Sequence, residues 1–197
     1  MKKCMWHLYY CATDVVDAND AWTSGHVGAG ICTDCGSYMP GNEGDFAVVV
    51  DQRIPTKADM FSVGRLSPSI LSARLRKLLP ERINEFLRFG DIYLGDPARK
   101  MASHFAFVGQ APWVLLFGDQ PAVMDGERVV AAKIAACPAC GVTFGFGRGR
   151  RYADTSVNVI REISWTEFGG VLISDEIMQS LTGIKLNNVR VEKIEIR

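Results

Sequence analysis

Two copies of one short cysteine motif carry the clearest chemistry in this sequence. They read CTDCG at 32–36 and CPACG at 137–141. A CxxC turn brings two sulfurs to one side, so two such turns facing each other supply the four tetrahedral thiolates that zinc accepts. The glycine after each second cysteine can take positive φ, which lets backbone N–H groups point at a sulfur. We therefore predict one Zn²⁺ ion bound by Cys32, Cys35, Cys137 and Cys140.

The predicted metal site is structural, because four cysteines close the coordination sphere and leave no position for water or substrate. Residues 36–136 separate Cys35 from Cys137, which is far more than a compact zinc ribbon uses. The free-energy cost of loop closure grows slowly, by roughly 0.6 kcal/mol for each doubling of the loop. A folded insert of this length therefore adds little to that cost. Structural zinc contributes on the order of 10 kcal/mol in small peptides, which offsets that cost.

Other interpretations of the two motifs remain open. A rubredoxin-like iron site uses the same four thiolates, and an iron-bearing redox protein is our third hypothesis. The motifs could also be two separate core turns or a redox dithiol. A thioredoxin-like dithiol needs a helix after the CxxC, and residues 141–149 are too rich in glycine to form one.

The remaining cysteines and the histidines give weaker signals. Cys4 and Cys11 frame His7, but they have opposite parity in a strand and would face opposite sides, so we expect core thiols there. His26 and His104 stand alone and are expected to be turn or sheet residues. No HExxH, GxSxG or Walker A pattern is found, so we predict that the protein is not an enzyme.

Composition and charge are those of a soluble globular protein. The chain has 197 residues, with 22 Lys or Arg against 22 Asp or Glu. This balance disfavours a general nucleic-acid binder. No signal peptide is apparent after Met1, and the most apolar stretches, Phe46–Val50 and Pro112–Gly118, are too short to span a bilayer. We expect a cytoplasmic protein without a membrane segment, in which thiols stay reduced and suit a metal.

A helical insert is predicted between the two motifs, over about residues 65–90. Ser67 and Pro68 suit an N-cap and a first helical position. Pro80 should stop or kink the helix, and a second helical segment should end with Gly90 as its C-cap. Four leucines would share one helical face: Leu71, Leu75, Leu78 and Leu79.

Strands are predicted on both sides of this insert. They are expected at 4–11, 46–50, 104–117, 128–137, 155–165 and 189–196. In the fifth of these, four apolar residues alternate so that they would share one face: Val157, Val159, Ile163 and Trp165.

The C-terminal part should contain one short helix and a final strand. Ser174 is a favourable N-cap, and Gly183 should end the helix. In the final strand Val189 has one parity and Ile194 the other. We predict a β-bulge near Glu192–Lys193 to reconcile them.

These patterns predict an α+β fold. Mixed or antiparallel sheets would surround a zinc-ribbon-like pair of CxxCG knuckles, with the helical insert between the knuckles. We expect a single domain over 1–197, because no linker is apparent. Its parts would be a zinc module from 31–52 and 128–152, the insert, and a strand-helix-strand unit at 155–197.

Two local groups of cations suggest an alternative function. The first is the insert, where only Glu81 and Glu85 oppose six cations: Arg65, Arg74, Arg76, Lys77, Arg82 and Arg88. The second is an expected hairpin tip at Arg148–Arg151. Either group is most simply a solvated face, but the insert could recognise an acidic partner. Together they allow a zinc-ribbon protein that binds nucleic acid.

The paired CxxCG motifs, with a long segment between them in a chain of this size, resemble the double-CXXCG motif immunity-protein family of myxobacteria. The context of CPACG and the tail from Gly170 through Leu181 to Val189 are also similar. The resemblance implies a cytoplasmic protein that neutralises a cognate toxin, and the cysteines and glycines of the two motifs match the family motif directly. It implies nothing about Cys4 and Cys11 or about which surface meets the toxin. Our first hypothesis is therefore an immunity protein that blocks one toxin domain through a protein interface.

Overall fold

The structure is a computed structural model. It describes the following residues: 4–10, 47–50, 57–62, 69–94, 99–109, 114–120, 122–124, 127–129, 134–139, 143–145, 148–166 and 170–197.

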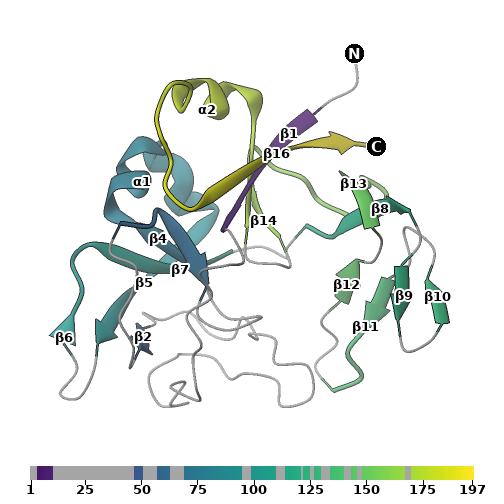
Figure 1. The fold of residues 1–197 in the computed structure, drawn as a ribbon, viewed down its shortest axis with the longest axis horizontal. Helices are drawn as coiled ribbons and strands as arrows, with labels where there is room; N and C mark the ends of the chain where they lie inside the picture. Colours follow the sequence, from purple (N-terminus) through teal and green to yellow (C-terminus); the bar gives the residue numbers. More distant parts are fainter. Residues whose placement is uncertain are drawn as a thin grey trace.

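Two six-stranded sheets dominate the described part of the chain (Figure 1). The first sheet has, in spatial order, β14 (Ile163–Trp165), β15 (Val171–Ile173), β1 (Cys4–Tyr10), β16 (Val189–Ile196), β13 (Arg148–Ala153) and β8 (Leu116–Gln120). The second has β2 (Ala47–Val50), β5 (Leu87–Leu94), β7 (His104–Gly109), β4 (Ser69–Ser72) and β3 (Met60–Ser62), with β6 (Arg99–Lys100) paired to β5. Two hairpins accompany them, β9 (Ala122–Met124) with β10 (Glu127–Val129), and β11 (Ile134–Ala136) with β12 (Thr143–Gly145).

The expected α+β class is wrong, because the described chain is mostly β-sheet. Its helices are α1 (Ala73–Leu78), the 3-10 helix η2 (Glu81–Glu85) and α2 (Asp175–Ser180). Within this part of the chain, none of these has the length and apolar character that crossing a bilayer requires.

The predicted helical insert consists of strand, helix and strand. Leu71 lies in β4 and Leu87 in β5, so only the middle of the insert is helical. The observed N-cap is Ser72, whose hydroxyl accepts from Leu75 N at 3.0 Å. The helix ends before Pro80, as predicted. Gly90 lies inside β5 and is not a C-cap, whereas Ser67 and Pro68 fall outside the described residues.

The main core lies between the two sheets. From the first sheet it takes Leu8, Ile163, Trp165, Val171 and Ile173, and from the second it takes Met60, Phe61, Ile70, Leu71, Leu87, Ile92, Ala106 and Phe107. The sheets approach closely at Gly109, where an added Cβ would lie 2.8 Å from Trp165 Cβ. The short helices cover this core with Leu75, Ile83 and Ile177. Trp6 Nε1 donates to Asp175 Oδ1 at 2.5 Å, which fastens α2 to β1.

The opposite face of the first sheet has its own core. Met5, Leu172 and Ile194 pack there with Val114, Leu116 and Ala153. This second core explains why the apolar residues of β16 change parity. The strand pairs with β1 in unbroken register from Cys4↔Glu195 to Tyr10↔Val189. The predicted bulge is therefore wrong. Val189 packs toward the main core and Ile194 toward the second, so one regular strand presents apolar residues to both faces.

The strand predicted at 155–165 is wrong over most of its length. Only β14 forms, at Ile163–Trp165, and the chain before it makes turns. Val157 is 46% exposed and Val159 is 78% exposed, so their alternation does not reflect burial. The short helix after Ser174 is confirmed, with the serine hydroxyl accepting from Ile177 N and Gly183 at φ +81° beyond its end.

Candidate functional site

The second cysteine motif lies on a hairpin. β11 and β12 are antiparallel, with Ala136 opposite Thr143, so the chain turns back on itself between them. Cys137 follows β11 directly and is 7% exposed, and Pro138 and Ala139 form a turn. A cysteine at a turn between two strands is compatible with a CxxC zinc knuckle.

The other three predicted ligands, Cys32, Cys35 and Cys140, lie outside the described residues. Within the described ranges, no three His, Cys, Asp or Glu side chains are grouped so that they could hold a metal. Cys4 is a half-buried thiol in β1. Cys11 and His26 lie outside the described residues. The four-cysteine zinc site therefore remains a prediction, to which the position of Cys137 is favourable.

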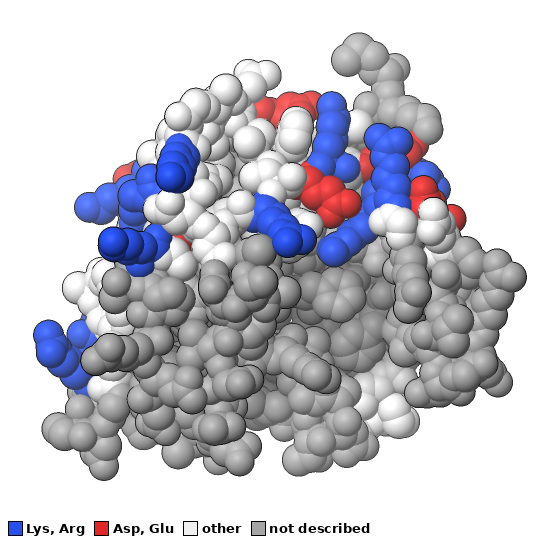
Figure 2. Space-filling model, viewed as in Figure 1, with Lys and Arg blue, Asp and Glu red and all other residues white. Residues whose placement is uncertain are grey.

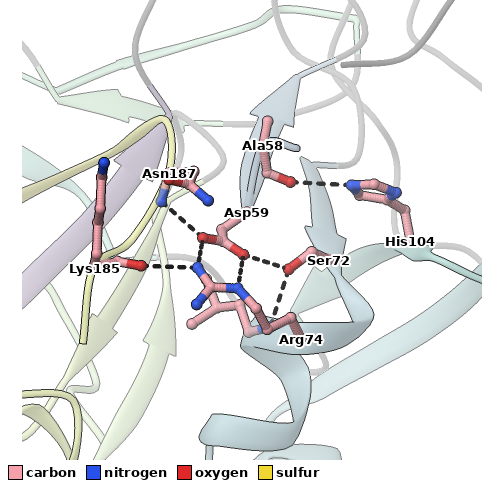
Figure 3. Close-up of polar contacts among 8 residues, drawn as sticks. Ala58, Asp59, Ser72, Arg74, His104, Lys185 and Asn187 are labelled. Carbon is pink, nitrogen blue, oxygen red and sulfur yellow. Dashed lines mark hydrogen bonds and ion pairs between the residues drawn. The ribbon is translucent and has the colours of Figure 1, made fainter. Parts of the chain in front are cut away.

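A buried carboxylate joins three separate segments of the chain (Figure 3). Asp59 is 1% exposed and forms a two-pronged ion pair with Arg74 of α1, in which Arg74 Nε donates to Oδ1 at 3.1 Å and Nη2 donates to Oδ2. Ser72 Oγ donates to Oδ1 at 2.7 Å, and Asn187 N donates to Oδ2 at 2.7 Å. Arg74 also donates to the carbonyl of Lys185 at 2.9 Å. The cluster ties the start of β3 to α1 and to the chain before β16.

These bonds set the charge of Asp59. Burial raises the pKa of this carboxyl, but the hydrogen bonds from Arg74, Asn187 and Ser72 outweigh burial and hold the pKa below its ordinary value. The carboxylate is therefore ionised near neutral pH, and its oxygens already accept from donors within the protein. It serves to hold the fold together, and sequence reasoning missed it because Arg74 looked like one more surface cation.

His104 belongs to the same region (Figure 3). It is 1% exposed in β7, with Nε2 3.0 Å from the Ala58 carbonyl and Nδ1 2.9 Å from Ser103 Oγ. Burial lowers its pKa, against opposing effects of the Ala58 hydrogen bond and of Asp59. The expectation that His104 is a sheet residue is confirmed.

His7 is buried in the first sheet. Its Nε2 lies 3.2 Å from Thr166 Oγ1, and its ring stacks on Tyr9 at 4.8 Å. Its Nδ1 has no hydrogen-bond partner among the described residues. Burial, with a smaller contribution from Arg151, lowers the pKa of His7 to about 3. Because the ring is 0% exposed, it is inaccessible to a substrate in this conformation.

The cations of the predicted basic segment differ in their partners in the structure. Arg74 binds Asp59, and Arg82 pairs with Glu162. Arg76 lies over aromatic rings, and Lys77 is exposed. Lys and Arg side chains are prominent around α1 in Figure 2, whereas around β13 and β16 they alternate with acidic ones.

The expected hairpin tip at Arg148–Arg151 is instead part of β13, which pairs with both β8 and β16. Arg151 lies 3.7 Å from Glu192 and over the Tyr9 ring. Gly149 has φ +79°, next to the irregular register between Arg148 and Arg151. These arginines therefore belong to a strand of the first sheet.

No protein-family model matches the chain, and no curated protein matches it. The resemblance to the double-CXXCG immunity proteins accordingly rests on the motifs themselves.

Proposed function

We propose that this protein is an immunity protein that binds and neutralises a cognate bacterial toxin, with a structural zinc ion held by Cys32, Cys35, Cys137 and Cys140. The observation that carries the proposal is the second motif, in which a buried Cys137 starts the turn of the β11–β12 hairpin. In the sequence CPACG follows a strand-like run, a context similar to that of the motif in the immunity-protein family that the sequence resembles.

The interior of the described part supports a binding role. Asp59 and His104 are each buried to 1% exposure and bonded within the fold, and His7 is fully buried. These groups make a rigid scaffold, and a rigid surface loses little conformational entropy when it binds a partner. The proposed mechanism is occlusion of the toxin's active site by a complementary protein surface.

Nucleic-acid binding is the alternative function. It would use phosphate contacts from the basic segment, but Arg74 and Arg82 already have carboxylate partners inside the protein. Their charges are therefore partly compensated, which reduces what the segment offers to phosphates.

Binding measurements separate the two functions. We would purify the protein and an inactivated form of the protein encoded by the adjacent reading frame, and titrate one with the other by calorimetry. A random-sequence DNA duplex would be titrated in parallel at several salt concentrations. The proposal expects tight one-to-one binding to the neighbouring protein. Binding to DNA alone, weakening steeply with salt, would reject it.

A further inference from the structure

Arg76 of α1 lies against two aromatic rings of the second sheet. Its guanidinium carbon is 4.1 Å from the ring centre of Phe89 in β5 and 4.4 Å from that of Phe105 in β7. The two rings themselves meet edge to face, with centres 6.5 Å apart and planes at 81°. Three elements thus hold one partly exposed arginine head in place.

This arginine has no carboxylate partner among the described residues. Its single hydrogen bond there runs from Nη2 to Asn84 Oδ1, at 3.3 Å. Arg197 makes an informative contrast, because it lies 3.9 Å from the Tyr152 ring centre and also pairs with Glu195 at 3.2 Å. Both arginines lie over aromatic rings, but among the described residues only Arg197 has a carboxylate partner.

The surroundings of Arg76 are positive. Residues 73–88 carry Arg74, Arg76, Lys77, Arg82 and Arg88 against Glu81 and Glu85. Asp59 pairs with Arg74 and Glu162 pairs with Arg82, so the α1 cations without a carboxylate partner among the described residues are Arg76 and Lys77. Lys77 is exposed on the neighbouring turn. Positive potential around an arginine that lacks a carboxylate attracts an acidic surface and disfavours a basic one.

We infer that Arg76 is the anchor through which the α1 face of this protein binds a carboxylate on an acidic surface of the toxin. Contact with the nearly perpendicular rings of Phe89 and Phe105 restricts where the guanidinium can move. The N–H groups of a guanidinium lie in its plane and point outward from its edge. A carboxylate can then bind through two parallel hydrogen bonds with little loss of side-chain freedom. Arginine and aromatic residues also dominate the strongest positions in protein interfaces. The inference rests on the proposed immunity function and names the surface that carries it.

The test compares two arginines that lie over aromatic rings. Arg76→Ala, Arg76→Lys and the matched control Arg197→Ala would be titrated with the inactivated neighbouring-frame protein, after their melting temperatures are recorded. Arg76→Ala should weaken binding roughly 30-fold or more. Arg76→Lys keeps the charge but lacks the planar fork, so it should also lose affinity. Arg197→Ala should bind within about fivefold of the parent.

The outcomes separate this inference from the function beneath it. If the parent binds and both Arg76 variants bind equally well, the anchor is overturned and the immunity function stands. If Arg76→Ala does not fold, unchanged affinity of a folded Arg76→Lys is enough to overturn it. If the parent does not bind, the proposed function fails and the anchor fails with it. If Arg76→Ala instead weakens binding to the DNA duplex alone, the partner is a nucleic acid and the inference is wrong.

Discussion

Gly170 passes so close to His7 that a Cβ at position 170 would lie 2.1 Å from His7 Nε2. The same glycine donates its N–H to Thr166 Oγ1 at 3.1 Å, and this hydroxyl is also the neighbour of His7 Nε2. His7 in β1, Thr166 after β14 and Gly170 before β15 therefore lie together in one small buried space. The absence of a side chain at position 170 makes room for the imidazole of His7.

We predict that Gly170→Ala destabilises the protein by about 1–3 kcal/mol, because the added methyl group must displace a buried ring or the backbone. Denaturant unfolding would measure the change. Gly183→Asn is the control, since Gly183 has φ +81° and nothing within 4 Å of an added Cβ, and asparagine tolerates this backbone region. Equal stability of Gly170→Ala and the parent would contradict this packing.

Stability should fall as the pH falls from about 6.5 toward 3, and His7 should contribute to that fall. Its pKa is about 3 in the folded protein and 6.5 as the ordinary value, so between these limits the unfolded chain binds the extra proton. The effect amounts to on the order of 4 kcal/mol at the acid end. His104 acts in the same direction, since burial lowers its pKa too.

Urea unfolding of the parent and of His7→Gln at a series of pH values would measure this dependence. The variant removes the titrating ring and keeps a polar group near Thr166, so its stability should change less with pH. Parallel curves for the two proteins would show that His7 titrates normally in the folded state.

Asp59→Asn should cost roughly 3 kcal/mol, because it leaves Arg74 without a carboxylate and disturbs the bonds from Ser72 and Asn187. The stability supplied by the lowered pKa of Asp59 is present above the ordinary carboxyl pKa and is lost as the pH falls through the folded value. Asp91→Asn is the control, because Asp91 pairs at 2.6 Å with the exposed Lys100 and should change stability little. Similar melting temperatures for both variants would mean that the Asp59 cluster contributes no more than a surface pair.

The purified protein should contain one zinc ion per chain and be colourless, whereas iron would absorb visible light. Cys35→Ser and Cys140→Ser should each lose the metal and melt at a lower temperature, because the predicted site links two distant segments of the chain. Metal analysis and thermal unfolding of the three proteins would test this. Variants with the parent's zinc content and melting temperature would rule out a shared site.

The sequence predicts those elements whose pattern is local. The strand predicted at 4–11 is found at Cys4–Tyr10, and the final strand at 189–196 and the helix capped by Ser174 are also found. Periodicity failed where burial comes from two sides. Leu71 completed an apparent helical face but lies in β4, all four residues of which are buried. The parity change in β16 likewise reflects two cores and no bulge.

Only the part of the candidate site that carries a sequence motif could be predicted from the sequence. The turn expected of a CxxC motif agrees with the structure at Pro138 and Ala139, which form a turn between β11 and β12. Nothing in the sequence links Asp59 to Arg74 and Asn187, because these contacts depend on the folded arrangement of distant segments. For the same reason, the contact of Arg76 with Phe89 and Phe105 is visible only in the structure.

Growth rescue tests the immunity function most directly. The adjacent reading frame would be expressed from an inducible promoter in a bacterial host, alone or together with this protein. We predict that the neighbour alone stops growth and that co-expression restores growth, with the two proteins purifying together. A toxic neighbour that this protein neither binds nor neutralises would contradict the immunity function.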